Sequence, residues 1–198
     1  MTFRLSQLLK DNETLTPTTY SDVIDLIESQ NIVALFQGRS EAGPRALGNR
    51  TIMFDPRNPD GKDIVNTVKR REWFRPFAAS IMLEHVHEWF DMAGLTESPF
   101  MMYAVDALPG VAETVPSVIH VDNTCRIQTV TEEQNKHWYN LIKEFHSRTG
   151  VPMLFNTSFN LAGDTMCETV DDALSTLRRS KIEYCYMPEI GMLLKVPN

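Results

Sequence analysis

The segment GRSEAGPRALGNR, Gly38–Arg50, dominates the sequence because it follows the apolar run Ile32–Phe36 with a single residue between them. It has three glycines, one proline and three arginines within thirteen residues. Glycine lets the backbone approach an anion and present its N–H groups, and arginine can bind two oxygens of an anion at once. A buried strand that leads into such a loop favours a phosphate site built on Arg39, Arg45 and Arg50. The alternative is an ordinary surface turn with solvated charges.

The charge distribution supports a local anion site and argues against general binding of nucleic acid. The formal net charge is −7, which is unfavourable for a broad polyanion surface. The segment from Arg39 to Arg75 nevertheless has nine Lys/Arg against five Asp/Glu, a surplus of four positive charges. A basic island in an acidic chain is typical of a confined anion pocket, although chance clustering on a solvated surface would give the same count.

The 198 residues fit one domain that can bury its own core. Helical and extended segments alternate irregularly, which favours a single α/β (α+β) domain with a mixed sheet. Residues 1–19 show no strong period and are expected to form an N-terminal extension to a domain at 20–198. We expect helices at 20–30, 62–72, 84–90 and 136–148 and after Thr169, capped in part by Ser21, Asn135 and Thr169, and a helical turn at 44–47. We expect strands at 32–36, 51–54, 78–82, 100–105, 153–155, 184–187 and 192–196, with 109–116 as a loop. Within 119–130 we expect a polar turn at Asp122–Thr124 that leads into an alternating strand.

Two further arginines are candidates for the same site. Arg75 lies between aromatic residues and before a proline, so it is either a surface side chain or a positioned ligand. Arg126 lies in an alternating strand beside apolar residues, where an unpaired charge would be costly. A structural salt bridge and an anion ligand explain Arg126 equally well.

Polar side chains follow the apolar strand Met153–Phe155. The segment Asn156–Asn160 has four short polar side chains among five residues, including Asn156, Ser158 and Asn160. They can donate hydrogen bonds to an anion or bind nucleotide hydroxyls. Local turns that satisfy the backbone are the alternative.

Other features restrict the class of protein. The cysteines Cys125, Cys167 and Cys185 are an odd set without paired spacing, which predicts reduced thiols in a cytoplasmic protein. No stretch is long and apolar enough to span a membrane, and the N-terminus lacks the apolar core of a signal peptide. His85 and His87 would diverge on a helix, so no metal site is expected in this chain.

Four blocks of the sequence resemble the C-terminal domain of the O-carbamoyltransferases, the family of the nodulation-factor, cephalosporin and tobramycin carbamoyltransferases. Small departures occur at Ala42, where the family usually has an aromatic residue, and at Asn123 and Cys125, where it has Ala or Gly. They leave the charged positions intact. The blocks are Gly38–Arg50, Phe74–Ala78, His120–Val130 and Thr149–Asn160.

The resemblance implies a YrdC-like fold, a twisted mixed sheet flanked by helices around a basic pocket. It implies binding of carbamoyl phosphate and ATP and formation of a carbamoyl-adenylate, with Mg²⁺ arriving on ATP. Ser158-Phe159-Asn160 is similar to the S-x-N element of YrdC-like nucleotide sites. By motif position, the phosphates would be held by Arg45, Arg50, Arg75 and Arg126, and Asn156, Ser158 and Asn160 would complete the pocket.

Members of the family also have a larger, actin-like N-terminal domain that binds a metal and passes the carbamoyl group to an acceptor hydroxyl. The 198 residues do not include it, so that domain is expected on a separate polypeptide, or the chain is a self-sufficient or degenerate version. A non-catalytic module that binds nucleotide or RNA phosphate within an assembly is the alternative function.

Overall fold

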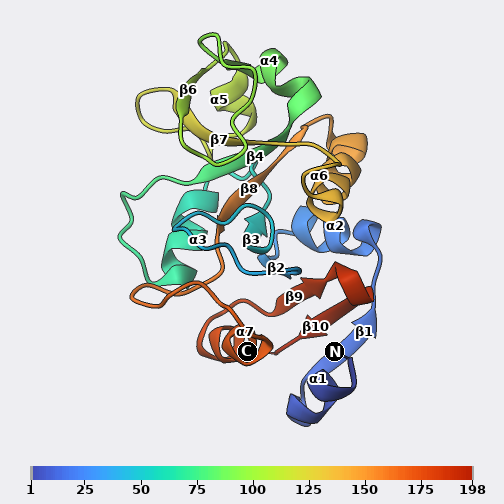
Figure 1. Cartoon of the computed structure of the whole chain (residues 1–198). Coiled ribbons are helices and arrows are strands. Elements are labelled where there is room, and N and C mark those ends of the chain that lie inside the picture. The colour runs from blue at the N-terminus through green and yellow to red at the C-terminus, as the bar shows by residue number, and fades with distance from the viewer. Residues whose placement is uncertain (1, 198) are drawn as a thin grey trace.

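One ten-stranded mixed sheet runs through the structure, a computed structural model that describes residues 2–197. Its order is β1-β10-β9-β2-β3-β8-β4-β7-β6-β5, which runs from the bottom to the top of Figure 1. The pairs β2–β9 and β4–β7 are parallel, and the other neighbours are antiparallel. The strands are β1 (Thr14–Pro17), β2 (Val33–Phe36), β3 (Arg50–Phe54), β4 (Ala78–Met82), β5 (Phe90–Asp91), β6 (Ala104–Ala107), β7 (Thr124–Val130), β8 (Met153–Ser158), β9 (Tyr184–Met187) and β10 (Met192–Lys195).

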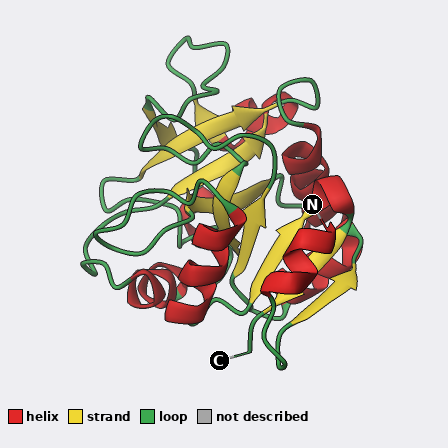
Figure 2. Cartoon of the chain, turned by 60° about the horizontal axis from the view of Figure 1, so that its bottom comes forward, coloured by secondary structure: helices red, strands yellow, loops and turns green. Residues whose placement is uncertain are grey.

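Helices flank the strands on both sides (Figure 2). In Figure 1, α2 and α6 lie side by side on one side of the central strands, and α3 lies on the other. The α-helices are α1 (Thr2–Leu8), α2 (Tyr20–Glu28), α3 (Gly61–Lys69), α4 (Val86–Trp89), α5 (Val111–Thr114), α6 (Lys136–Thr149) and α7 (Val170–Arg179), with 3₁₀ turns at Leu83–His85 and Pro188–Ile190.

Side-chain caps begin three of the helices. Asn135 accepts a hydrogen bond from the backbone N–H of Trp138, and Thr169 forms a capping box with Asp172, so both predicted caps are confirmed. The cap of α2 is Thr19, paired with Asp22. Our prediction of Ser21 was wrong because Ser21 already lies inside the first turn.

Several expected boundaries differ from the structure. Within the expected N-terminal extension, residues 14–17 form edge strand β1, paired antiparallel with β10. The expected helical turn at 44–47 does not form. Helix α3 ends at Lys69 because Arg70 adopts a left-handed conformation at φ 55°. Strand β8 continues through Ser158, the strand expected at 100–105 begins only at Ala104, and the loop at 109–116 contains α5.

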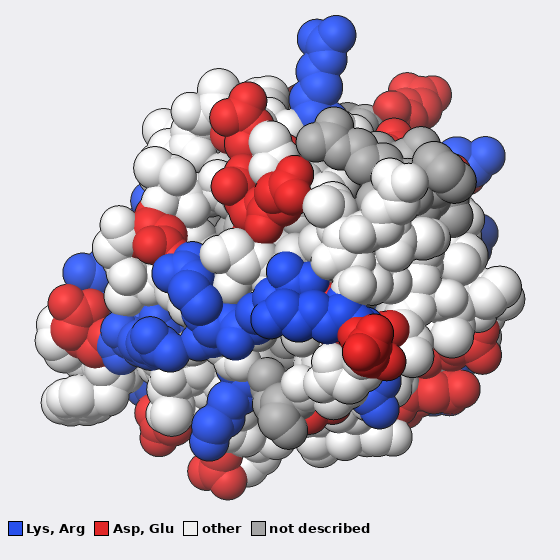
Figure 3. All heavy atoms as spheres, turned by 90° about the horizontal axis from the view of Figure 1, so that it is seen from below, with Lys and Arg blue, Asp and Glu red and all other residues white. Residues whose placement is uncertain are grey.

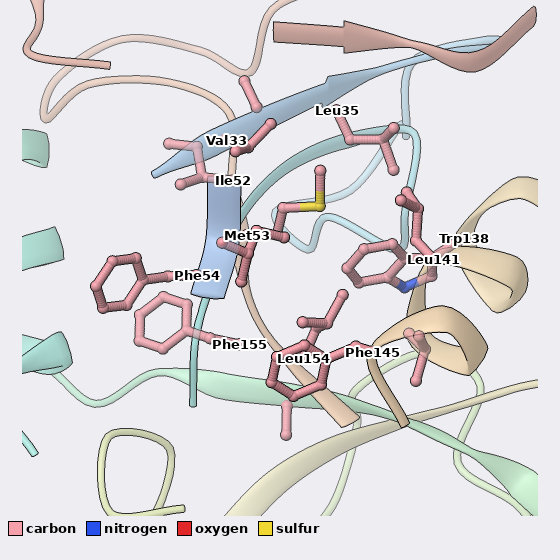
Figure 4. Packing of buried hydrophobic residues seen from close by; sticks show 14 of the residues in the cluster. Val33, Leu35, Ile52, Met53, Phe54, Trp138, Leu141, Phe145, Leu154 and Phe155 are labelled. Carbon is pink, nitrogen blue, oxygen red and sulfur yellow. The ribbon is translucent and has the colours of Figure 1, made fainter. Parts of the chain in front are cut away.

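The core packs helices against alternating residues of the central strands. In Figure 4, Trp138, Leu141 and Phe145 of α6 point toward the strands, and all three are fully buried. Successive side chains of a strand point to opposite faces, so the Leu154 face of β8, which packs against α6, also carries Asn156 and Ser158. The opposite face carries Phe155, whose ring meets Phe54 edge-on at 6.3 Å. The sheet thus places Asn156 and Ser158 on the face that α6 covers, beyond the end of the apolar packing.

Gly48 is where the loop 38–50 passes closest to this core. Its φ is +102°, and a Cβ there would lie 2.5 Å from Cδ1 of Trp138. We expect Gly48→Ala to lower the free energy of unfolding by about 3 kcal/mol, because it combines backbone strain with overpacking. Urea denaturation would measure the change.

Gly150 gives the matched control. Its φ is +76°, but no atom lies within 4 Å of the place that a Cβ would take, so Gly150→Ala should cost only about 1 kcal/mol of backbone strain. Equal losses for the two variants would contradict the close packing of Gly48 on Trp138.

Candidate functional site

Buried side chains fix the loop 38–50 over the end of the sheet. Within the loop, one oxygen of Glu41 accepts hydrogen bonds from the backbone N–H groups of Leu47 (3.0 Å) and Asn49 (2.8 Å). From the sheet, Gln128 donates to the carbonyl of Leu47 at 3.0 Å, and Asn156 donates to that of Ala46 at 3.0 Å. These contacts occupy backbone groups that a helical turn would need, so the loop is irregular but held at several points.

Four arginines surround one cavity of about 570 Å³ beside this loop. Arg45 comes from the loop, Arg126 from β7, and Arg71 and Arg75 from the segment after α3. Segments distant in sequence therefore converge on one place. The cavity is also lined by Asn156, Ser158, Ala78, Phe77, Met101 and His120, among others.

The floor of the cavity is formed by a row of paired residues on three neighbouring strands. Ala78 of β4 pairs with Asn156 of β8 on one side and with Arg126 of β7 on the other. Paired residues in a sheet point to the same face, and all three line the cavity. Because the middle residue is only an alanine, the row leaves a hollow between a polar amide and a guanidinium.

The cavity has more positive charge than its neighbours neutralise. Among residues 2–197, the side chains of Arg45 and Arg126 have no hydrogen-bond or ion-pair partner. Burial lowers the pKa of the Arg45 guanidinium, and the charge of Arg126 lowers it further. Burial likewise lowers the pKa of Arg71, with Arg75 and Arg45 adding to the effect. An arginine stays protonated even so, so several like charges face this one cavity.

The other two arginines are partly engaged. Arg75 is exposed and forms an ion pair with Glu72, with 2.7 Å between Nε and Oε2. Arg71 lies over the ring of Phe77 at 4.6 Å and donates to the carbonyl of Pro76 at 2.9 Å. An exposed ion pair of this kind is weak, so Arg75 can exchange its partner for an anion at small cost.

Three buried polar atoms of the cavity side chains lack a partner among the described residues. They are Nε of Arg71, Nε of Arg126 and Oδ1 of Asn156. Buried polar groups are seldom left unsatisfied in native proteins. Two cationic donors and one acceptor fit a ligand that combines an anionic group with a hydrogen-bond donor.

Arg50 does not reach this cavity. Its guanidinium donates to the carbonyl oxygens of Gln37, Asn49, Gly38 and Glu168 at 2.5–3.3 Å, and the residue is 2 % exposed. Its Cζ atom lies 3.7 Å from the centre of the Phe36 ring. We therefore correct the predicted phosphate contact of Arg50: backbone carbonyls occupy both of its terminal nitrogens, and it ties both ends of the loop to the segment before α7.

Arg39 also lies away from the arginine cavity. Its side chain is exposed, and only its backbone carbonyl has a described contact, a 2.9 Å hydrogen bond from Asn49. The expected role of Arg39 as a ligand thus finds no support in its position.

Lys69 holds the end of β8 in place. Its ammonium donates to the carbonyls of Ser158 and Asn160 and to Oδ1 of Asn160, and Ser158 Oγ donates to the same Oδ1 at 2.7 Å. Burial and the charge of Arg71 lower the pKa of Lys69 to about 7. Asn160 consequently faces Lys69 and lines an adjoining cavity of about 270 Å³, whereas Ser158 lines both cavities.

His120 stabilises another wall of the arginine cavity. Its Nε2 lies 3.0 Å from the carbonyl of Phe77, which can only accept, so this nitrogen carries the proton. Nδ1 lies 3.0 Å from Oγ1 of Thr124. The contacts hold the segment before β7 against the start of β4.

Sequence reasoning groups Arg45, Arg75, Arg126, Asn156 and Ser158, and the structure does bring them to one cavity. The same reasoning misses Lys69, Arg71 and His120. It misses the first two because a basic triplet such as Lys69–Arg71 is typical of charges that complement a helix end. The one signal in the sequence is the closeness of the triplet to Arg75. The left-handed residue Arg70, which redirects the chain before Arg71, is seen only in the structure.

Charges of each sign segregate on the surface as well. Figure 3 shows Lys and Arg side chains in a band across one face, with Asp and Glu on both sides of it. Local basic surface therefore coexists with the overall charge of −7.

Within the described residues, no three His, Cys, Asp or Glu side chains come together as a metal site would require. None of the helices in this part of the chain is both long and apolar enough to cross a membrane. The three cysteines are buried and free.

Comparisons with known proteins agree on one family. The model of the carbamoyltransferase C-terminus matches residues 24–193. The nodulation protein NolO of Bradyrhizobium diazoefficiens is 38 % identical over 165 residues, which cover 82 % of this chain and 30 % of NolO. NolNO of Sinorhizobium fredii is 42 % identical over 154 residues, 77 % of this chain and 23 % of NolNO. The chain thus spans under a third of these relatives.

Solved structures resemble the fold at low identity. A full-length HypF structure, described as phosphate- and nucleotide-bound, matches with a TM-score of 0.56 and 14 % identity over 84 % of this chain and 21 % of HypF. HypF of T. kodakarensis matches with a TM-score of 0.57 and 14 % identity, over 94 % of this chain and 23 % of that protein. The predicted mixed α/β fold of YrdC-like type is confirmed.

The Lys69 contacts predict a loss of stability. Lys69→Met keeps the length of the side chain but leaves the oxygens of Ser158 and Asn160 without their donor, so unfolding should be easier by about 2 kcal/mol. Lys62→Met is the control, since Lys62 lies on the first turn of the same helix without a described hydrogen bond. Its effect should be under about 0.5 kcal/mol in urea denaturation.

The difference in unfolding free energy between wild type and Lys69→Met should also depend on pH. The folded pKa of Lys69 is about 7, and the unfolded value is about 10.4, so the unfolded state binds more protons between these values. Wild-type unfolding free energy should therefore gain a contribution that rises from pH 7 to pH 9, and Lys69→Met should lack it. Parallel pH profiles for the two proteins would refute the lowered pKa of Lys69.

Proposed function

The chain belongs to the carbamoyltransferase C-terminal family, and from this premise we propose that it binds carbamoyl phosphate and ATP and forms a carbamoyl-adenylate. The carbamoyl group would then pass to an acceptor hydroxyl, which makes the chain the adenylating part of an O-carbamoyltransferase. One observation carries the proposal: Arg45, Arg71, Arg75 and Arg126 converge on one cavity, and two of them have no described counter-charge.

The chemistry fits this charge. Carbamoyl phosphate and ATP are both polyanions, so holding them together requires fixed positive groups that do not depend on a proton supply. Arginine provides such charge at any physiological pH. Adenylation depends on alignment of the reacting groups and on neutralising the charge that develops as pyrophosphate leaves, more than on a protein nucleophile.

The cavity residues divide this task by position. Arg126 lies on the rigid floor, Arg45 on the anchored loop, and Arg71 and Arg75 at the other side. Ser158 offers a hydroxyl at the junction of the two cavities. ATP would bring Mg²⁺ with it, which would neutralise phosphate charge; no carboxylate is among the described residues that line the arginine cavity.

We infer that a further domain completes the reaction. The relatives are more than three times as long as the segment they share with this chain, so the actin-like transfer domain is assigned to another polypeptide or another region. Trp73 and Phe74 are 74 % and 62 % exposed beside Arg75 and offer apolar surface for such a contact. Three buried free thiols are compatible with the expected cytoplasmic location.

Pyrophosphate release tests the proposal. Wild-type protein should release pyrophosphate from ATP only when carbamoyl phosphate is present. Arg75→Ala should lower this rate about 30-fold, corresponding to about 2 kcal/mol of lost anion stabilisation. Arg39→Ala is the matched control, because Arg39 is an exposed arginine away from the cavity, and its rate should stay within about twofold.

The assay should be run with the chain alone and with the remaining region of a longer relative added. No release in either arm would refute the adenylation step. Nucleotide binding that is tight but indifferent to carbamoyl phosphate would instead favour a non-catalytic phosphate-binding module. Equal losses in Arg75→Ala and Arg39→Ala would count against the arginine cavity as the site.

A further inference from the structure

Asn156 lines the floor of the arginine cavity, and its side-chain amide has an acceptor without a described partner. The residue is 1 % exposed, and its Oδ1 has no hydrogen-bond partner among the described residues. Asn156 is paired with Ala78, which in turn is paired with Arg126, so the free oxygen belongs to the same row as a free guanidinium nitrogen.

Its neighbours determine which way the amide faces. The nitrogen of Asn156 donates to the carbonyl of Ala46 at 3.0 Å and to Oγ of Ser80 at 2.8 Å. A backbone carbonyl can only accept, so exchanging the two ends of the amide would place two oxygens against each other.

Gln128 reinforces this orientation. Its own nitrogen donates to the carbonyl of Leu47 at 3.0 Å, which turns its oxygen toward Ser80 and Asn156. That oxygen accepts from Ser80 at 2.7 Å and lies 3.4 Å from the Asn156 nitrogen. The network therefore uses the donors of Asn156 fully and leaves its acceptor for something else.

The polar groups at the two ends of this row are complementary to the two ends of carbamoyl phosphate. Neighbouring strands are about 4.8 Å apart, so the Asn156 and Arg126 backbones are separated by roughly 10 Å across the alanine hollow. A small molecule lying over Ala78 can meet an acceptor at one end and a cation at the other. Carbamoyl phosphate has an amino group at one end and a phosphate at the other, whereas acetyl phosphate has a methyl group in place of the amino group.

We propose that Oδ1 of Asn156 accepts a hydrogen bond from the carbamoyl amino group while Arg126 binds the phosphate, and that this pairing selects carbamoyl phosphate over acyl phosphates of the same shape. The inference rests on the proposed function and assigns a specificity-determining residue to it. An acyl phosphate would bury Oδ1 against a methyl group, and leaving such an acceptor unpaired is costly.

Two stable phosphonates isolate this contact. Phosphonoacetamide has the amide of carbamoyl phosphate, and acetonylphosphonate has a methyl ketone of nearly the same shape; neither hydrolyses as the phosphates do. Calorimetry at one fixed salt concentration should show that wild-type protein binds phosphonoacetamide at least tenfold more tightly. Asn156→Ala should bind both equally, with most of the loss confined to phosphonoacetamide.

Ser80→Ala supplies the matched control. It removes one acceptor of the Asn156 nitrogen and leaves Oδ1 untouched, so both phosphonates should weaken together and their ratio should persist. A purely structural role for Asn156 would likewise weaken both ligands and keep the ratio.

Each outcome separates the inference from the proposed function. If wild-type protein binds both phosphonates equally, or if Asn156→Ala keeps the preference, the role of Asn156 is refuted while the anion site stands. If wild-type protein binds neither phosphonate, both proposals are overturned. The wild-type ratio decides the matter even if Asn156→Ala does not fold.

Discussion

Repulsion between like charges is the constraint around which this structure is organised. Arg45, Arg71, Arg75 and Arg126 face one cavity, and the partial burial of Arg71 and Arg126 reduces the screening that water would give those two. Two of them have no described partner, so the surrounding scaffold must hold these like charges near one another. A binding site commonly has such local cost, because the groups that await a ligand cannot satisfy each other.

The scaffold offsets this repulsion with backbone geometry and buried hydrogen bonds. A cross-strand row places Asn156 and Arg126 on either side of an alanine, and Gln128 and Asn156 hold the loop carbonyls. Arg50 donates to four carbonyls, and Lys69 fixes the end of β8. Arg50 and Lys69 thus stabilise the scaffold, so that the cavity arginines can remain free for an anion.

Sequence patterns are sufficient for the fold class and for part of the site. Buried strands and the helix caps at Asn135 and Thr169 follow from local rules of hydrophobic pattern and capping. The grouping of Arg45, Arg75 and Arg126 follows from the family resemblance, and the structure places all three around one cavity. The patterns cannot tell Arg50 from its neighbours. Whether an arginine meets carbonyls or a cavity depends on contacts with distant residues such as Glu168.

The residues that could not be predicted from the sequence, Lys69 and Arg71, also depend on distant contacts. Nothing local distinguishes a lysine that ends a helix in solvent from Lys69, which ends one beneath a strand. The left-handed residue Arg70 reverses the direction of the next side chain, and no glycine or asparagine announces that turn. Polar residues after Phe155 are typical of a loop, yet they continue β8 because β3 and β4 pair with it on both sides.

The central claim is that uncompensated positive charge in this cavity awaits an anion. The most direct test is the unfolding free energy of wild-type protein and Arg126→Gln at low ionic strength, with and without inorganic pyrophosphate. Without the anion, Arg126→Gln should be the more stable protein; with it, wild type should gain about 2.7 kcal/mol at one hundred times its dissociation constant, and the variant far less. A less stable variant without the anion, or equal stabilisation of both proteins by it, would contradict the account.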